Sequence, residues 1–213
     1  MSLLDMITGH AGQEVASEAH HNFGVSKNQV IALLAVAAPL VISYLRKKAE
    51  HDPAEADALN SALEKDHDGS ILNNPAQAKE RQTEGGSILD HIFGSEKGAV
   101  ENQLAGKTGI SMDKIGPVLA MLAPLIMGYL GKQKRDNGVS SGGGLGDLLG
   151  GILGNAQSQA QHGNPLNDIL GNVLGGGGQS GNPLNDILGS VMGGGGKQQG
   201  GLGGVLGSLL GGK

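Results

Sequence analysis

The sequence has no cysteine and very few aromatic residues. Cysteine is absent from all 213 residues, which excludes disulfide bonds and metal sites with thiolate ligands. Tryptophan is also absent, and aromatic residues make up only 2% of the chain. Proteins that bind single-stranded nucleic acid stack the bases on aromatic side chains, so the composition argues against this class.

An excess of positive charge is also missing. Fifteen Lys and Arg residues against 20 Asp and Glu residues give a net charge of −5. Nucleic-acid binding depends on basic surface patches. The small basic clusters here, within residues 46–48 and 132–135, follow long apolar segments, where cations stabilise the C-terminal end of a helix. We therefore expect no nucleic-acid partner.

No apolar run has the usual length of a transmembrane helix. The two longest runs, residues 30–45 and 115–130, both contain proline and are shorter than the roughly 20 residues that a span needs. The first residues have neither the basic region nor the long apolar region of a secretory signal. We expect buried core helices in a cytoplasmic protein without a transmembrane helix.

Glycine, by contrast, is abundant, but it is concentrated towards the C-terminus. Of the 40 glycines, 27 follow Arg135. Residues 1–135 have the composition of a small domain with a modest core. Residues 136–213 form a glycine-rich, low-complexity tail that we expect to be largely flexible.

The domain contains an internal duplication. Residues 2–48 align without gaps on residues 87–133, with 16 identities in 47 pairs, where chance gives about three. Residues 49–86 connect the two units. Within this connector, an Asp-Pro pair at residues 52–53 starts a helix that we expect to reach about residue 65.

Each unit carries the same order of helix signals. Ser, an apolar pair and Asp open it, a spacing that caps a short helix, and Gly closes that helix in a left-handed conformation. Another Gly and a capping Ser precede a long apolar helix, at residues 27–50 and 112–135. Pro39 and Pro124 occupy matched positions in these helices and should kink them. The pattern predicts an all-α, pseudo-twofold helical bundle.

Together these motifs resemble a known bacterial family. They are Ala38-Pro39-Leu40, Ala123-Pro124-Leu125, Asp68-Gly69-Ser70-Ile71-Leu72, and the run from Gly86 to Gly94 that leads to Thr108-Gly109-Ile110. With them, residues 1–135 resemble the domain-of-unknown-function family DUF937, and more loosely the YidB-like proteins. The resemblance implies a bacterial origin and an all-helical fold, and it implies no activity.

The polar residues do not form a recognisable catalytic or metal site. Residues 64–75 partly match a calcium loop, but Pro75 stands where the closing glutamate is needed, so we favour a glycine-capped helix end over weak metal binding. The seven histidines lack ligand spacing and are expected at the surface. Tyr44 and Tyr129 match across the units and favour a helix interface over a ligand pocket. We expect no enzyme activity, no cofactor and no metal.

The tail repeats a short helical pattern. The clearest copies are residues 164–174 and 182–192, a related copy is 145–153, and a degenerate one is 202–210. Asn-Pro starts the clearest copies, and such short helices become ordered when their apolar face is covered. The apolar residues fall on one helical face, which we expect to be an interaction surface: Leu166, Ile169, Leu170, Val173, Leu174, Leu184, Ile187, Leu188 and Val191.

These features predict a non-enzymatic interaction or scaffolding protein whose partner is a protein, such as a second copy of itself. The opening helix of each unit shares a Leu-x-Asp-like pattern with the tail helices. Tail helices that dock into the groove used by an opening helix would give head-to-tail assembly. Two alternatives stay open: a ligand-binding or partner-binding domain with a passive tail, and membrane-surface association of the tail. The second is disfavoured because the tail helices lack Lys and Arg on their polar face.

Overall fold

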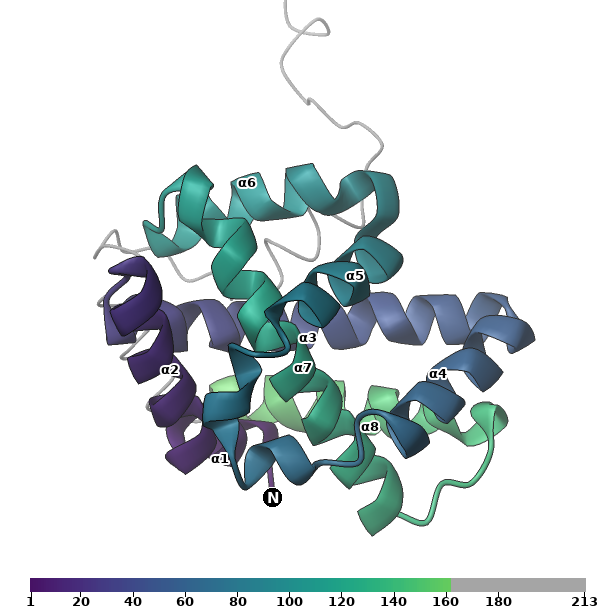
Figure 1. Ribbon diagram of the computed structural model, residues 1–213. Coiled ribbons are helices and arrows are strands. Elements are labelled where there is room, and N and C mark those ends of the chain that lie inside the picture. The colour runs from purple at the N-terminus through teal and green to yellow at the C-terminus, as the bar shows by residue number, and fades with distance from the viewer. Residues whose placement is uncertain (162–213) are drawn as a thin grey trace, which may run out of the picture.

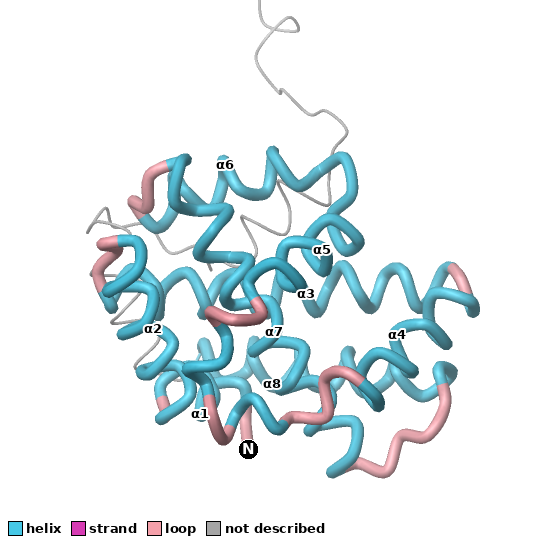
Figure 2. The backbone as a smooth tube through the Cα atoms, in the orientation of Figure 1, coloured by secondary structure: helices cyan, strands magenta, loops and turns pink. Residues whose placement is uncertain are grey.

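The computed structural model describes residues 1–161, which form helices joined by short loops (Figures 1 and 2). No strand occurs within this range, which confirms the expected all-α fold. The α-helices are α1 (Leu3–Thr8), α2 (His10–Phe23), α3 (Lys27–His51), α4 (Pro53–Lys65), α5 (Gln82–Phe93), α6 (Lys97–Thr108), α7 (Met112–Asp136) and α8 (Leu145–Gln161). Four short 3-10 helices accompany them: η1 (Ser70–Leu72), η2 (Pro75–Ala78), η3 (Gly94–Glu96) and η4 (Gly142–Gly144).

The two long helices α3 and α7 form the centre of the core. They contact each other, run in different directions, and are surrounded by the other helices (Figure 1). Both are long and apolar enough to cross a membrane by length and composition alone, although most of the apolar stretch of each is buried by the protein itself. The absence of a transmembrane helix therefore stays a prediction.

The offset of 85 residues found in the sequence also separates helix boundaries in the structure. It relates the first and last residues of α3 to those of α7. The helices before them, α2 and α6, end directly before Gly24 and Gly109, whose φ angles are 65° and 68°. Positive φ favours glycine, because a side chain is strained there, so both glycines end their helices as the sequence predicted.

The openings of the two units differ from the expected pattern. Ser2 and Asp5 form the expected capping box of α1, but Ser87 lies inside α5, which begins five residues earlier than the repeat unit. Packing on α7 explains the extension, because Gly85 lies against the backbone of Ala120 and leaves no room for a side chain. Gly9 is not left-handed, since its φ is −79° and α2 starts at the next residue.

The packed structure continues beyond the composition change at residue 135. Residues 145–153, the first copy of the tail pattern, form the start of α8. This helix packs mainly on α3 and also contacts α1 and α7. Part of the glycine-rich tail therefore contributes to the hydrophobic core.

Candidate interaction sites

The contact between α8 and α3 shows how one copy of the tail pattern is bound. Leu145 and Leu149 are fully buried, and Ile152 is only 7% exposed. These residues are spaced four and three apart, so they lie on one face of the helix. We call the surface that they cover on α3, α1 and α7 the α8 seat.

Glycines allow α8 to lie close to α3 at this seat. A Cβ atom on Gly150 would lie 3.2 Å from the guanidinium carbon of Arg46, which is closer than an ordinary van der Waals contact. A Cβ atom on Gly146 would lie 3.6 Å from Cγ of Glu50, which is an ordinary contact. Arg46 and Glu50 form an ion pair of 2.7 Å on α3. The seat is therefore tight at Gly150 and less tight at Gly146.

A small cavity of about 90 Å³ lies at one end of the seat, between α1, α7 and α8. Leu3, Tyr129 and Ile152 line it. Burial raises the pKa of Tyr129 to about 12, with a smaller contribution from the negative charge of Asp5. Tyr44 donates a hydrogen bond to Glu96, so the two tyrosines lie at helix interfaces, as expected from the sequence.

A larger groove of about 570 Å³ lies between α4 and α5, with α3 and α7 beneath it. Its middle is apolar and is lined by side chains from all four helices: Leu45, Leu59, Ala62, Ile88, Ile92 and Met127. This volume is in the range that binds small organic molecules. We call it the α4–α5 groove.

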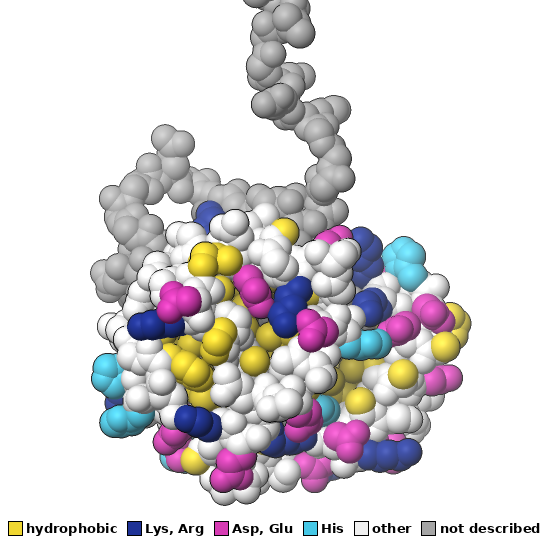
Figure 3. All heavy atoms as spheres, turned by 45° about the horizontal axis from the view of Figure 1, so that its top comes forward, with side chains coloured by type: hydrophobic (Ala, Val, Ile, Leu, Met, Phe, Trp, Pro, Cys, Tyr) yellow, Lys and Arg dark blue, Asp and Glu magenta, His cyan; other side chains and the backbone are white. Residues whose placement is uncertain are grey.

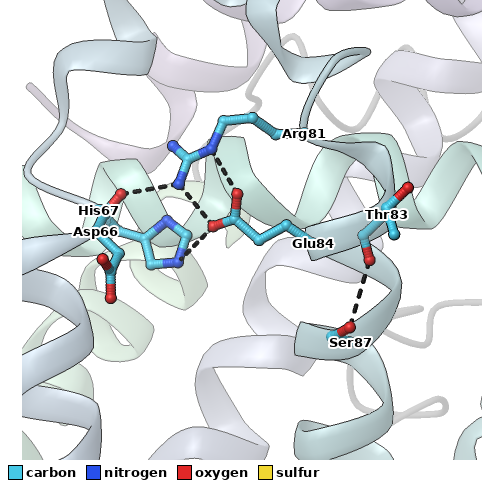
Figure 4. Close-up of polar contacts among 6 residues, drawn as sticks. All are labelled: Asp66, His67, Arg81, Thr83, Glu84 and Ser87. Atoms are coloured by element: carbon cyan, nitrogen blue, oxygen red, sulfur yellow. Dashed lines mark hydrogen bonds and ion pairs between the residues drawn. The ribbon is translucent and has the colours of Figure 1, made fainter.

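A polar cluster closes one end of this groove (Figure 4). Arg81 donates through Nε and Nη2 to both carboxylate oxygens of Glu84, each at 2.6 Å, and through Nη2 to the carbonyl oxygen of Asp66 at 2.9 Å. Nε2 of His67 lies 3.3 Å from the same carboxylate. The cluster connects the C-terminal end of α4 to the first turn of α5.

His67 is the buried member of this cluster. It is 4% exposed, and its Nδ1 atom is buried without a hydrogen-bond partner. Burial lowers the pKa of His67, although the nearby carboxylate of Glu84 opposes this shift. The neutral imidazole is therefore favoured in the folded protein. The expectation that the histidines lie at the surface is wrong for His67, because the packing of α4 on α7 encloses the second residue after the helix end.

A second polar cluster closes the other end of the groove. Nε2 of His91 lies 2.9 Å from a carboxylate oxygen of Glu55, which again joins α5 to α4. Lys48 of α3 donates to the carbonyl oxygen of His91 at 2.6 Å and lies 3.9 Å from Glu55. Both ends of the groove are thus bridged by polar contacts, and its apolar middle is open.

Comparison with known families identifies the family of this chain. The family model that describes a bacterial protein of unknown function, DUF937, matches residues 5–133. The chain belongs to this family. No similar protein was found among curated proteins or solved structures. The DUF937 match covers α1 to α7, whereas α8 and the rest of the tail follow it.

The partial calcium loop adopts the helix end that the sequence favoured. Asp66 follows the last residue of α4, and Gly69 has a φ of 92°. Asp68 accepts a hydrogen bond of 2.9 Å from the backbone nitrogen of Ser70, which lowers the pKa of its carboxyl group. Within residues 1–161, no group of three or more His, Asp or Glu side chains is placed to hold a metal ion.

All residues of the expected tail interaction surface, from Leu166 to Val191, lie outside the described residues. Their equivalents in the first copy of the pattern are described: Leu145, Leu149 and Ile152 are buried, and Leu148 and Leu153 are partly buried against the core. On the face shown in Figure 3, charges of both signs are intermixed with histidines and apolar side chains.

Proposed function

We propose that this DUF937 protein is a non-enzymatic, cytoplasmic self-assembly module, in which tail helices of one molecule bind the α8 seat of another. The observation that supports this is that the later tail copies carry apolar residues at the three positions that α8 buries. Leu145, Leu149 and Ile152 correspond to Leu166, Leu170 and Val173, and then to Leu184, Leu188 and Val191.

The glycine pattern of the copies supports the same seat. Gly150, at the tight contact with Arg46, corresponds to Gly171, Gly189 and Gly207, so every copy has glycine at this position. Gly146 makes only an ordinary contact, and the two clearest copies have asparagine in its place. The copies differ from α8 where the seat has room, and they match it where the seat is tight.

A later copy can also compete with α8 in helix formation. The position of Gly151, where a Cβ atom would meet nothing within 4 Å, is taken by Asn172 and Ser190. Replacing glycine inside a helix by an ordinary residue gains up to about 0.5 kcal/mol at each position. The Asn-Pro pair that starts each clear copy adds a cap signal, whereas two glycines stand in its place before Leu145. Together these differences favour the later copies by about 1 kcal/mol.

Because the pattern is repeated, one tail can bind the seats of more than one molecule. Residues 136–213 carry four copies of the pattern, while the described domain offers one α8 seat. If a later copy takes the seat of its own molecule, or if α8 does, the remaining copies are available to other molecules. Several copies of the pattern on one chain raise the effective concentration at each seat, so assembly should depend on protein concentration.

The test is the solution mass of the full chain over a range of concentrations, measured by light scattering. The variant Leu170→Asp/Leu188→Asp places a charge at the buried position of both clear copies. We expect the wild-type chain to form oligomers and the variant to be largely monomeric. The matched control is Asn172→Asp/Ser190→Asp, which adds the same charge at the position of Gly151, where a Cβ atom would meet nothing within 4 Å.

Two results would contradict the proposal. A wild-type chain that stays monomeric at all concentrations leaves the tail as a spacer. Oligomers that persist unchanged in the Leu170→Asp/Leu188→Asp variant, and also when Leu206→Asp removes the copy at residues 202–210, place the interface elsewhere. Flotation of the full chain with anionic vesicles, lost in the same variant, would instead favour membrane-surface association of the tail.

A further inference from the structure

The internal repeat relates the α4–α5 groove to the small cavity at the end of the α8 seat. At the offset of 85 residues, the two sites share three lining positions: Ser2, Leu3 and Gln133 at the cavity, and Ser87, Ile88 and Lys48 at the groove. The wall that α1 and α7 form beside α8 is therefore repeated by α5 and α3 in the groove.

The two sites differ in what covers the repeated wall. Leu3 of α1 is 5% exposed, and it lines the 90 Å³ cavity together with Ile152 of α8. Its counterpart Ile88 of α5 is only partly buried and lines the open 570 Å³ of the groove. Polar bridges join α4 to α5 at Glu55 and at Asp66, and the space between these bridges is open. An apolar position that a tail helix covers in the first unit is thus left uncovered in the second.

The groove has room for one copy of the tail pattern along its length. It follows α4 from Glu55 to Asp66, which is about 16 Å at 1.5 Å per residue. Residues 184–192 would span about 12 Å as a helix. A helix of this copy can therefore lie between the two polar bridges.

The chemistry of the groove also fits such a helix. Its middle is apolar, as at Leu59 and Ile88, and its charged groups lie towards the two ends, where Asp66 is exposed to solvent. Asp147 of α8 is exposed as well, so the equivalent Asp186 of the tail copy would face solvent when the stripe of that copy is buried. Burial of the stripe then leaves no carboxylate in the apolar middle.

Chain length selects the copy that can reach the groove of its own molecule. η4 packs on α4, and α8 runs from η4 towards α1, so Gln161 at its far end lies about 24 Å from this part of α4 (Figure 1). Residues 164–174 begin three residues later, within about 10 Å of Gln161. Before residues 182–192 stand the 20 residues 162–181, which can extend over about 66 Å. The second clear copy therefore has the necessary reach.

We propose that residues 182–192 dock as a helix in the α4–α5 groove of their own chain, with their apolar stripe over Ile88 and Leu59. The docked copy is withheld from the α8 seats of other molecules, so the groove controls how many tail copies take part in assembly. This regulatory consequence rests on the proposed function. The docking itself needs no second molecule and holds whether or not the tail mediates assembly.

Methionines on both sides of the contact provide the test in the full chain. The chain has six methionines, of which Met127 lines the groove and Met192 belongs to the tail copy. With isotope-labelled methionine methyl groups, Leu184→Asp/Leu188→Asp should shift the Met127 signal, because a charged stripe does not dock. The matched variant Leu166→Asp/Leu170→Asp adds the same charges to the other clear copy and should leave the Met127 signal unchanged.

Variants in the groove perturb the same contact from the other side. Ile88→Asp places a charge in the apolar middle, and Ala58→Asp places one at the exposed rim, so that a folding defect in the first does not prevent the test. Both should shift the Met192 signal. Ala54→Asp, one turn earlier on α4 and outside the groove, is the matched control and should leave the Met192 signal unchanged.

Three results would overturn the proposal. One is a Met127 signal that responds to neither tail variant or equally to both, and another is a Met192 signal that ignores both groove variants. The third is a set of shifts that disappears on dilution, because docking within one chain does not depend on concentration. A monomeric wild-type chain in light scattering would contradict assembly and leave these shifts in place, so the two proposals can fail separately.

Discussion

Truncating Leu149 tests whether the later tail copies can replace α8. This side chain is fully buried, and a buried Leu→Ala change usually costs about 2 to 5 kcal/mol. The loss in free energy of unfolding has an upper limit, because a later copy can replace a weakened α8 at the seat. If a copy such as residues 164–174 takes over, the loss in free energy of unfolding should stay below about 1 kcal/mol, because the helix-forming signals of that copy are at least as favourable as those of α8.

Urea denaturation followed by circular dichroism measures this loss in two backgrounds. In the wild-type tail, we expect Leu149→Ala to lower the free energy of unfolding only slightly. In the Leu170→Asp/Leu188→Asp background, where neither clear copy can replace α8, we expect a loss of about 2 kcal/mol or more. Equal losses in both backgrounds would refute the exchange of helices at the seat. A loss that depends on protein concentration would indicate that the replacing helix comes from another molecule.

Three further predictions concern the domain itself. Gly131→Ala should lower the free energy of unfolding by at least about 1 to 3 kcal/mol, because the new Cβ atom would lie 1.7 Å from the carbonyl oxygen of His67, whereas Gly151→Ala, in open space, should not destabilise. His67→Gln should reduce the loss in free energy of unfolding between pH 7 and pH 5. Burial lowers the pKa of His67 in the folded protein, so the unfolded chain binds more protons than the folded one as the pH falls through 6.5, and the wild type loses stability there. Because burial raises the pKa of both Tyr44 and Tyr129, ultraviolet absorbance should show no tyrosine ionisation near pH 10 before alkaline unfolding; normal titration would contradict both placements.

The sequence was sufficient to predict the elements whose signals are local. The long helices were expected at residues 27–50 and 112–135, and α3 and α7 each extend one residue further. The Asp-Pro start at residue 52 predicted α4 with its observed bounds. Caps, proline positions and apolar periodicity act within a few residues, so one sequence is enough to read them.

The elements that the sequence missed depend on contacts between distant segments. The early start of α5 follows from the approach of Gly85 to α7, and Gln82 donates to the carbonyl oxygen of Pro117 at 3.2 Å. The burial of His67 follows from the approach of α4 to Gly131. A polar residue after a helix end normally lies in solvent, so no local signal marked this histidine or the groove that it lines.

The two long helices also show why α8 packs mainly on α3 and only slightly on α7. Arg46 of α3 and Gly131 of α7 are related by the offset of 85 residues, and each is covered by a different helix. At Gly131, glycine in the long helix lets the backbone of α4 approach. At Arg46, the long helix has a large side chain, and the docking helix has a glycine, Gly150, beside its guanidinium group. A helix with an apolar stripe and a glycine after its second buried residue therefore fits α3 at this place without displacing Arg46, and each later copy of the tail pattern has this sequence.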